Sequence, residues 1–359
     1  MKKYKVGIIG CGGIAESKHL PALVKLDYVE IVWLCDIIEA KAEYLKEKFS
    51  LSSAKVCTDY KEVAGDPEVD AVHVLTPNRE HGFITVDCLD AEKHVLCEKP
   101  MAKTAEDARK MLDAAKRNHK VLSIAYQNRQ RTDSLYLKKL IEEGELGEIY
   151  YARALALRRR AVPTWGVFLD AEEQGGGPLI DIGTHALDLC LWLMDNYEVD
   201  YVVGNSYRKL GDRENAANAF GPWDPEEFTV EDSCFGFITM KNGATVSLES
   251  SWAINLLNYQ EASVVLAGSE GGADMFDGLR INGERNSRLY TWKPDLEQGG
   301  VDYFEARGHD SPADRECKEF YQAIEEKRNP LVMPEQALLV TEILEAVYES
   351  AKTRKPVYF

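Results

Sequence analysis

Short apolar runs rich in β-branched residues alternate with helix-compatible stretches over the first 125 residues of the chain. Alternation of this kind predicts parallel strands joined by helices that cover both faces of one sheet. The expected strands are 5–9, 29–35, 71–75, 94–97 and 121–125, and the expected helices are 13–26, 40–49, 80–91 and 104–118. We therefore expect an α/β first domain with a doubly wound parallel sheet over 1–125.

The pattern changes after about residue 130, where longer extended runs follow one another with few helices between them. These runs are 148–157, 200–209, 233–240, 244–252 and 261–267, and helices are expected at 135–143, 179–194, 312–327 and 335–353. Asn242-Gly243 tolerates the positive φ angles of a type I′ turn and predicts a hairpin. We expect an α+β domain with a mainly antiparallel sheet over 126–335, and a C-terminal segment, 336–359, that returns toward the first domain.

The first expected strand runs directly into Gly10-Cys11-Gly12-Gly13-Ile14-Ala15 and then a helix. This is the G-x-G-x-x-A form of the Rossmann fingerprint, in the strand–turn–helix context that confirms it. Gly10 permits a tight turn, Gly12 lets the backbone approach a pyrophosphate, and Ala15 keeps the helix close to the strand. The N–H groups at the start of the helix then face the phosphates. We predict that Gly10, Cys11, Gly12, Gly13 and Ile14 line a dinucleotide.

Asp36 stands at the end of the second expected strand. A carboxylate there accepts hydrogen bonds from the adenosine ribose hydroxyls and repels the 2′-phosphate of NADP. Ile37 and Ile38 follow it, so the sequence places no arginine next to Asp36 to bind that phosphate. The sequence therefore predicts NAD as the cofactor. The alternative is an aspartate at a strand end that caps the next helix.

Three segments carry a resemblance to a known family. They are the N-terminal GIIGCGGIA, the pair TPN and HVLCEKP at 76–78 and 94–100, and GGGPLIDIGTH at 175–185. In order and spacing they resemble the Gfo/Idh/MocA family, the glucose-fructose oxidoreductase and inositol dehydrogenase group. The resemblance implies a Rossmann domain followed by a domain built on an open antiparallel sheet. It also implies homo-oligomers, dimers or tetramers, that assemble through this sheet.

The resemblance also assigns roles to individual positions. Lys99 matches the catalytic lysine of the family, and Asp181 and His185 match the acidic and histidine positions of the third segment. Gln127 and Arg129 fall where the family often has residues near the nicotinamide. The positions that match residues lining the cofactor are Thr76, Asn78, His81, Glu98 and Lys99.

The chemistry of Lys99, Asp181 and His185 suits oxidation of an alcohol, because a hydroxyl must lose a proton as its carbon loses a hydride. Lys99 follows an expected strand, at the sheet edge where such folds bind ligands, and its ammonium can stabilise developing alkoxide charge. Asp181 and His185 are four residues apart, on one face of the expected helix. We interpret His185 as the general base, although the sequence leaves open an exchange of roles with Lys99. Structural roles, such as a surface lysine or an acidic residue near a helix start, are the alternative.

The stretch 157–168 contains Arg158 and Trp165 and lies between an expected strand and the glycine-rich loop. A tryptophan face stacks on a pyranose and an arginine donates hydrogen bonds to hydroxyls, so these two residues are candidate substrate contacts. An interdomain loop with a solvated basic run explains the stretch equally well.

Composition narrows the class of protein further. The formal net charge of the 359 residues is −17, so the surface repels the phosphates of nucleic acids and anionic lipids, and we expect neither partner. The N-terminal apolar stretch is too short for a signal peptide, and no run approaches the roughly 20 apolar residues of a membrane span. The eight cysteines include no C-x-x-C pair, so we expect no metal site and reduced thiols in the cytoplasm.

The predicted function is therefore NAD-dependent hydride transfer at a secondary hydroxyl of a sugar or glycoside, with ring carbon three as one activity that the resemblance implies. Three alternatives remain at this point. One is an inositol dehydrogenase, and another is an NAD-dependent glycoside hydrolase or lyase that oxidises its substrate only transiently. The third is a sensor that binds NAD without catalysis.

Overall fold

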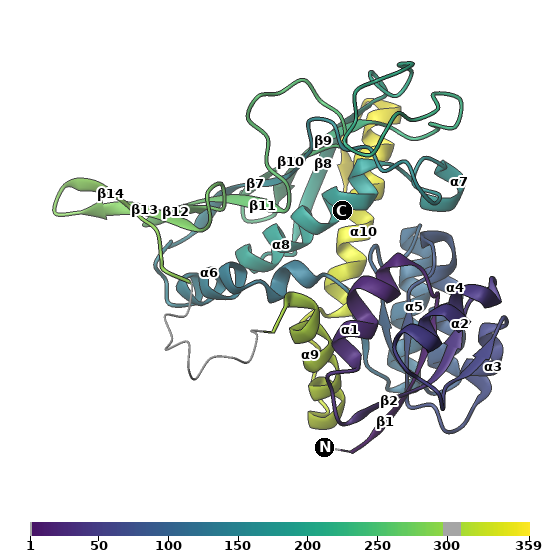
Figure 1. Cartoon of the computed structure of the whole chain (residues 1–359). Coiled ribbons are helices and arrows are strands. Elements are labelled where there is room, and N and C mark those ends of the chain that lie inside the picture. The colour runs from purple at the N-terminus through teal and green to yellow at the C-terminus, as the bar shows by residue number, and fades with distance from the viewer. Residues whose placement is uncertain (1, 297–309) are drawn as a thin grey trace. The chain divides into compact units, whose positions relative to one another are not determined.

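The computed structural model describes residues 2–296 and 310–359, and contacts divide the chain into two compact units. The first unit comprises 1–127 and 310–341, and the second comprises 128–309 and 342–359. Figure 1 shows the elements of both units in sequence colours. No helix in the described part of the chain is long and apolar enough to cross a membrane.

The first unit is built on a six-stranded sheet in the order β3-β2-β1-β4-β5-β6, and all of its pairs are parallel. The strand order runs outward from β1 in both directions. Because such crossovers are right-handed, the helices of the two halves cover opposite faces of the sheet. The strands are β1 (Tyr4–Ile9), β2 (Val29–Cys35), β3 (Lys55–Cys57), β4 (Ala71–Val74), β5 (His94–Cys97) and β6 (Leu122–Ile124). The doubly wound parallel sheet expected from the sequence is confirmed.

Seven helical segments connect these strands or follow them. Those at 39–48, 78–90 and 105–118 lie close to the expected helices 40–49, 80–91 and 104–118, whereas those at 60–65 and 127–130 were not expected. They are η1 (Ala15–His19), α1 (Leu20–Leu23), α2 (Glu39–Lys48), α3 (Tyr60–Gly65), α4 (Asn78–Asp90), α5 (Ala105–Asn118) and the 3-10 turn η2 (Gln127–Gln130). The carboxyl ends of parallel strands meet at one edge of a sheet. Gly10, Asp36, Thr76 and Glu98, which follow β1, β2, β4 and β5, therefore share that edge.

The first helix differs from the regular helix expected over 13–26. Residues 15–19 form a π-helical turn, in which the N–H of Leu20 donates to the carbonyl of Ala15 five residues earlier. A short α-helix with Pro21 in its first turn follows. Proline has no N–H to donate and its ring crowds the preceding turn, which gives a physical reason for the change of helical register here.

The second unit is built on a nine-stranded sheet in the order β14-β13-β12-β11-β7-β10-β9-β8-β15. All neighbours are antiparallel except β7 and β10, so the expectation of a mainly antiparallel sheet is confirmed. β13 and β14 form an arm at one end of the sheet (Figure 1). The strands are β7 (Ile149–Leu157), β8 (Val199–Tyr207), β9 (Ser233–Met240), β10 (Thr245–Ser251), β11 (Ser263–Gly268), β12 (Gly271–Asp274), β13 (Arg280–Arg285), β14 (Arg288–Trp292) and β15 (Val357–Tyr358).

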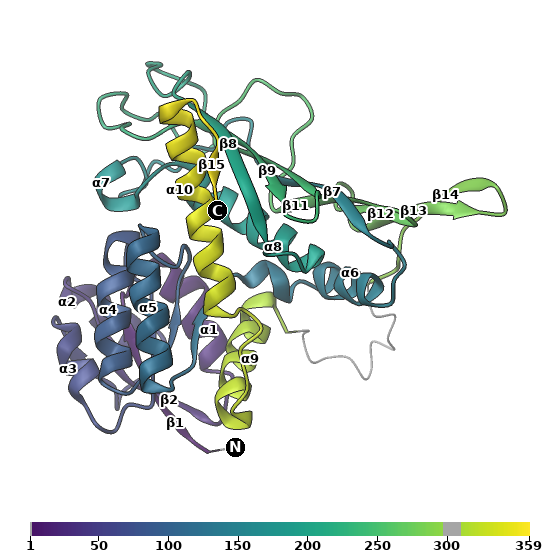
Figure 2. The ribbon, with the colours of Figure 1, turned by 180° about the vertical axis from the view of Figure 1, so that it is seen from behind.

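The helical segments 179–183 and 184–194 and the later part of the C-terminal helix 334–353 pack against one face of this sheet. Gly204 and Gly236 make room for Val347 of α10, since an added Cβ atom on either glycine would lie within 3.0 Å of that valine. Figure 2 shows α10 alongside β8 and β15. The helical segments are α6 (Thr132–Glu142), α7 (Ala171–Gln174), η3 (Leu179–Gly183), α8 (Thr184–Met194) and the later residues of α10 (Pro334–Thr353).

The hairpin between β9 and β10 forms as expected, but its turn is not type I′. That type needs positive φ at both central residues, whereas φ is positive at Gly243 (88°) and not at Asn242. The N–H of Gly243 donates to the carbonyl of Met240, and the side chain of Asn242 accepts from the N–H of Ala244. The geometry is that of a longer loop with its glycine in the left-handed region, in which the asparagine side chain stabilises the turn.

The division of the C-terminal part also differs from the expected one. Residues 310–335, which we expected in the second domain, belong to the first unit, where α9 (Pro312–Glu326) contributes Cys317, Phe320 and Tyr321 to the core. Residues 342–359, which we expected to return toward the first domain, belong to the second unit. Apolar periodicity shows that a helix is amphipathic but does not show which core it covers.

Candidate functional site

The glycine turn after β1 has the geometry that its fingerprint requires. Gly10 has φ +97°, and an added Cβ atom would lie 2.6 Å from the carbonyl carbon of Leu75. Only glycine fits there. Added Cβ atoms on Gly12 and Gly13 would meet nothing within 4 Å, so the backbone is open for the close approach of a ligand. The turn therefore fits a dinucleotide pyrophosphate, which binds to the N–H groups at a helix start.

Asp36 connects the end of β2 to this turn. Its Oδ2 accepts a hydrogen bond from the N–H of Cys11 at 2.8 Å, and its Oδ1 accepts one from the N–H of Ile38 at 2.9 Å. The second bond forms a local Asx turn before α2, whose N-cap is Ile38 without a side-chain cap, so Asp36 orders the approach to α2 but does not cap it as the alternative expected. A carboxylate has about four lone-pair sites, and two remain for ribose hydroxyls. Ile37 beside it is 88% exposed, which leaves that side of the carboxylate apolar.

Thr76, Asn78 and His81 follow β4, and the structure gives them different surroundings. The Thr76 hydroxyl is buried and has no hydrogen-bond partner among the described residues, as expected for a group that a ligand completes. Asn78 is the first residue of α4 and is buried. The ring of His81 lies between the carbonyls of Pro100 and Thr76, each 2.8 Å from a ring nitrogen. His81 therefore links the loops that follow β4 and β5, and its ring is only 1% exposed.

Glu98, directly after β5, is a buried carboxylate beside several donors. Its Oε1 accepts hydrogen bonds from Lys18 at 3.4 Å and from His19 at 3.1 Å, and its Oε2 accepts one from the N–H of Lys99 at 3.1 Å. Burial alone would raise the pKa of Glu98, but Lys18, His19 and Lys99 outweigh that effect and hold the pKa well below its usual value. The carboxylate therefore stays ionised and fixes the backbone from which Lys99 projects. The Lys99 side chain is partly exposed.

A chain of buried hydrogen bonds extends from Glu98 into the core. His19 Nδ1 lies 2.9 Å from His73 Nδ1, and His73 Nε2 lies 3.0 Å from the hydroxyl of Tyr321. Burial lowers the pKa of both histidines, so both are neutral at pH 7. Because Glu98 only accepts, one direction satisfies every group: Tyr321 donates to His73, His73 to His19, and His19 to Glu98.

Sequence reasoning missed His19, His73 and Tyr321, which lie on η1, β4 and α9. The one available signal was a histidine inside the apolar run 71–75. The side chains of His19, His73 and Cys317 lie close enough to hold a metal ion, with ligand atoms within 4.8 Å of one another. The histidine nitrogens are already bonded in the chain above, and burial raises the pKa of the Cys317 thiol well above its usual value. A metal needs the thiolate, so these groups fit the hydrogen-bonded chain better than a metal site.

In the second unit, Asp181 and His185 lie at the junction of η3 and α8. Both are partly exposed, whereas Ile180, Ile182 and Thr184 around them are buried, so both face the same side of the helix as expected. Asp181 Oδ2 accepts a hydrogen bond from the indole N–H of Trp252 at 3.0 Å.

The glycines before this helix make room for protein groups. A Cβ atom on Gly176 would lie 2.1 Å from the Tyr348 hydroxyl, and one on Gly177 would lie 2.3 Å from the Glu231 carbonyl oxygen. The carboxylate of Glu231 accepts hydrogen bonds from the N–H groups of Gly177 and Leu179 and from the hydroxyl of Tyr348. Glu231 and Tyr348, which sequence reasoning missed, therefore hold the start of the segment that carries Asp181.

Two arginines that the sequence marked for ligand contact have protein partners. Arg129 is fully buried and forms a bidentate pair with Asp188, so it could contact a ligand only by leaving that pair. Arg158 pairs with Glu261, and its side chain is 23% exposed. Burial lowers the pKa of Arg158, but the Glu261 hydrogen bond and the charges of Glu261 and Asp181 raise it overall. Arg158 therefore contributes positive charge near Asp181.

Gln127 begins η2 and is partly buried.

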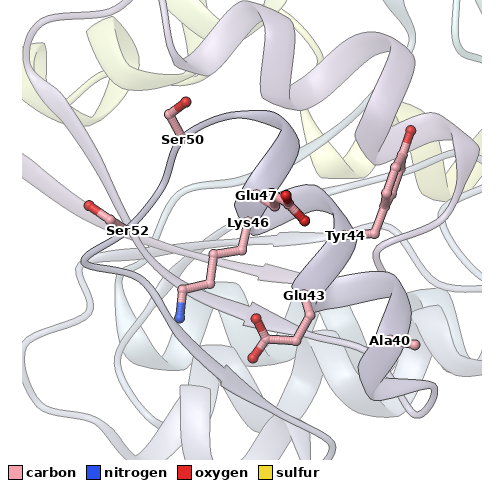
Figure 3. Close-up of a pocket in the computed structure, with 7 residues that line it drawn as sticks. All are labelled: Ala40, Glu43, Tyr44, Lys46, Glu47, Ser50 and Ser52. Carbon is pink, nitrogen blue, oxygen red and sulfur yellow. The ribbon is translucent and has the colours of Figure 1, made fainter.

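Figure 3 shows an open hollow on the exposed side of α2. The residues that line it are Ala40, Glu43, Tyr44, Lys46, Glu47, Ser50 and Ser52. Neither the glycine turn nor Asp36 lines it, so we do not assign it to the dinucleotide.

Comparisons with known proteins cover both units. Residues 4–126 match the model of an oxidoreductase family with an NAD-binding Rossmann fold, and residues 138–359 match the C-terminal alpha/beta domain of the same family. A D-glucoside 3-dehydrogenase of Escherichia coli (strain K12) is 36% identical over 349 residues, which are 97% of this chain and 95% of that protein. An inositol 2-dehydrogenase of Salmonella typhimurium (strain LT2) is 30% identical over 193 residues, 53% of this chain and 54% of that protein.

Among solved structures, a levoglucosan dehydrogenase in complex with NADH and levoglucosan has a TM-score of 0.82 and 24% identity. The similarity covers 99% of each chain, and at this identity it shows the shared fold alone.

Proposed function

Because the chain belongs to the Gfo/Idh/MocA family of oxidoreductases, with an NAD-binding Rossmann domain, we propose that it oxidises a secondary hydroxyl of a sugar or glycoside. We propose ring carbon three as the position oxidised, on the strength of the 36% identity with a D-glucoside 3-dehydrogenase along 97% of this chain. The observation that carries the proposal is the glycine turn with Asp36 at one sheet edge, next to the loop that bears Lys99.

NAD, when bound, supplies the hydride acceptor. Gly10, Gly12 and the N–H groups before η1 would hold its pyrophosphate, and Asp36 would hold its ribose. The Thr76 hydroxyl and Gln127 are further proposed contacts. NAD is preferred to NADP because a 2′-phosphate would meet the Asp36 carboxylate and the apolar side chains of Ile37 and Ile38.

Three side chains are proposed to work on the substrate hydroxyl. His185 takes its proton as general base, and the Lys99 ammonium stabilises the negative charge that develops on oxygen. Asp181, oriented by Trp252, accepts a hydrogen bond from a neighbouring hydroxyl. Arg158, whose pKa the charge of Asp181 raises, is proposed to donate to a substrate hydroxyl.

The test is formation of NADH, measured at 340 nm on a panel of free sugars, inositols and aryl glycosides, with identification of the products. We expect a ketone at ring carbon three of a sugar or glycoside. An inositol as best substrate would favour the inositol dehydrogenase, and glycoside cleavage without net NADH would favour a hydrolase or lyase. NAD binding with no turnover on any member would favour the sensor.

Two variants test the assignments within this proposal. His185→Ala should lower kcat by about 10²- to 10⁴-fold, the usual contribution of general acid–base catalysis, while the Kd for NAD stays within twofold. His119→Ala, which replaces an exposed histidine after α5, is the control. Calorimetry should show tighter binding of NAD than of NADP, and Asp36→Ala should reduce the difference. Tighter NADP binding by the unmodified protein would contradict the role of Asp36.

We also propose that copies of the chain associate through the sheet face opposite α8 and α10. That face carries half-exposed aromatic side chains, including Phe237 (44%) and Tyr207 (40%), with the Arg153–Glu249 ion pair between strands. Light scattering of unmodified protein and of Phe237→Glu tests the association, and a monomer at micromolar concentration would contradict it.

We propose a cytoplasmic location as well. All eight cysteines are buried thiols that form no disulfide, which supports a reducing, cytoplasmic setting.

A further inference from the structure

Four aromatic side chains of the second unit form a continuous row that begins at Asp181; we call Trp252, Phe168, Trp165 and Phe220 the aromatic row. The indole N–H of Trp252 donates to Asp181. Ring centroids along the row are 6.5, 5.9 and 4.8 Å apart, and each pair meets edge to face at 78°, 71° and 88°. This is a favoured aromatic geometry, so the row is a packed assembly rather than a chance grouping.

Exposure increases along the aromatic row. Trp252 is fully buried and Phe168 is partly buried, whereas Trp165 is 52% exposed and Phe220 is 47% exposed. Two large adjacent rings that remain half exposed forgo the stabilisation that burial would give them. Contiguous exposed apolar surface beside polar groups is typical of a binding site.

Hydrogen bonds between two loops hold the outer rings in place. Asn218 accepts from the N–H of Val162 at 2.8 Å and donates to its carbonyl at 2.9 Å, and the Thr164 hydroxyl donates to the carbonyl of Phe220 at 2.8 Å. These bonds join the loop that carries Trp165 to the loop that carries Phe220. The outer rings are therefore preorganised, which lowers the entropy lost when a ligand binds.

We propose that Trp165 and Phe220 form a subsite for the group attached to the reacting sugar, that is, the aryl group or second sugar ring of a glycoside. The inference rests on the proposed function, in which Asp181 contacts the ring that is oxidised. Trp165 is separated from Asp181 by two intervening rings, so it reaches a group beyond that sugar ring. Its face suits a planar aryl group or the apolar face of a pyranose.

The proposal specifies a substrate class. Asp181, His185 and Arg158 offer hydrogen bonds to the hydroxyls of the reacting ring, and a free sugar satisfies them as well as a glycoside does. Only a glycoside also covers Trp165 and Phe220. The enzyme should therefore act on glycosides with an aryl or sugar aglycone more efficiently than on free sugars or methyl glycosides.

The experiment compares D-glucose, methyl β-D-glucopyranoside and phenyl β-D-glucopyranoside with unmodified enzyme, Trp165→Ser and Phe220→Ser. Stacking of one aromatic pair corresponds to about a two- to twelvefold effect. We expect each variant to raise KM for the phenyl glucoside by that factor and to change KM for D-glucose and the methyl glucoside by less than twofold. Calorimetric binding of the phenyl glucoside to NAD-loaded protein should weaken in parallel.

Phe83→Ser is the matched control, since Phe83 is 50% exposed, packs its ring against Tyr60 and belongs to the first unit. It should leave every KM unchanged. Equal effects of Trp165→Ser and Phe220→Ser on all three substrates, or no effect on any, would overturn the subsite while NADH formation still supported the proposed function. Absence of NADH with every substrate of the panel would instead refute the proposed function, and the binding measurement would still decide whether the rings contact an aryl group.

Discussion

Replacement of Glu98 by glutamine tests whether its charge holds the sheet edge together. The side chain of Glu98 is 6% exposed and that of its partner Lys18 is 17% exposed, so the variant would strand a buried ammonium. Removal of one partner from a buried pair costs about 3–5 kcal/mol, and the residual exposure of Lys18 places the expected loss at the lower end, about 3 kcal/mol. For a domain of this size that loss lowers Tm by about 6–12 °C.

The assay is urea unfolding at pH 7.5 together with thermal melting. Glu106→Gln is the control, because its carboxylate is 78% exposed and pairs with Lys110 on the surface of α5. That variant should change the unfolding free energy by less than about 0.5 kcal/mol. Addition of Lys18→Met to Glu98→Gln should restore at least half of the lost stability, since it removes the stranded cation.

Measurements of activity and of the pH dependence of stability in the same variants distinguish the effect of the Glu98 charge from an effect of packing. Glu98 Oε2 orients the backbone of Lys99, so kcat of Glu98→Gln should fall more than the affinity for NAD. Because the pKa of Glu98 is lowered in the folded state, its stabilisation is complete above its unfolded pKa of about 4.5 and is lost as the pH falls below that value. The stability difference from the unmodified protein should shrink in the same range. If Glu98→Gln were as stable as the unmodified protein at pH 7.5, the charge of Glu98 would not stabilise the fold and this prediction would be refuted.

Three further predictions follow from groups of known burial. The pKa of His73 is well below 6.5 in the folded state, so this residue by itself should contribute a loss of stability of about 1.4 kcal/mol per pH unit below pH 6.5, in addition to the losses from other histidines whose pKa burial lowers, such as His19. His73→Leu should reduce the slope of unfolding free energy against pH by that amount. Gly10→Ala should weaken NAD binding by more than tenfold in calorimetry, because φ at this position is +97° and backbone atoms lie 2.6 Å from the added Cβ atom. Gly65→Ala is the control and should leave NAD binding unchanged, because its added Cβ atom meets nothing within 4 Å. Asp188→Asn should lower the unfolding free energy by about 3–5 kcal/mol, because both Asp188 and Arg129 are 0% exposed, and Asp188→Leu with Arg129→Met should recover most of it.

The parallel half of the fold could be predicted because its signals are local. Each buried strand is a continuous apolar run, and the glycine turn follows the first of them directly. β3 escaped prediction because it has three residues, and β13 and β14 escaped because few of their residues are buried and no apolar alternation marks them. Short or exposed strands are held by hydrogen bonds to their neighbours, and a pattern along one segment does not contain those bonds.

The candidate site could be predicted only in part, for the same reason. Gly10 and Asp36 act close to their own positions in the chain. The row of hydrogen bonds from Glu98 to Tyr321 joins residues that lie 79, 54 and 248 positions apart, so no short-range pattern in the sequence predicts it. Burial fixes the direction of its hydrogen bonds, because a neutral histidine donates from one nitrogen and accepts at the other.

Asp181, His185 and Asp188 show how burial decides a role that spacing leaves open. Spacings of four and three residues would place all three on one helical face. In the structure His185 and Asp188 both belong to α8, whereas Asp181 belongs to the preceding π-helical segment η3. Asp181 and His185 are partly exposed, whereas Asp188 is fully buried and accepts hydrogen bonds from Arg129 at both carboxylate oxygens. The partner that makes Asp188 structural lies 59 residues away, so a single sequence identifies the acidic residues but not which of them can contact a substrate.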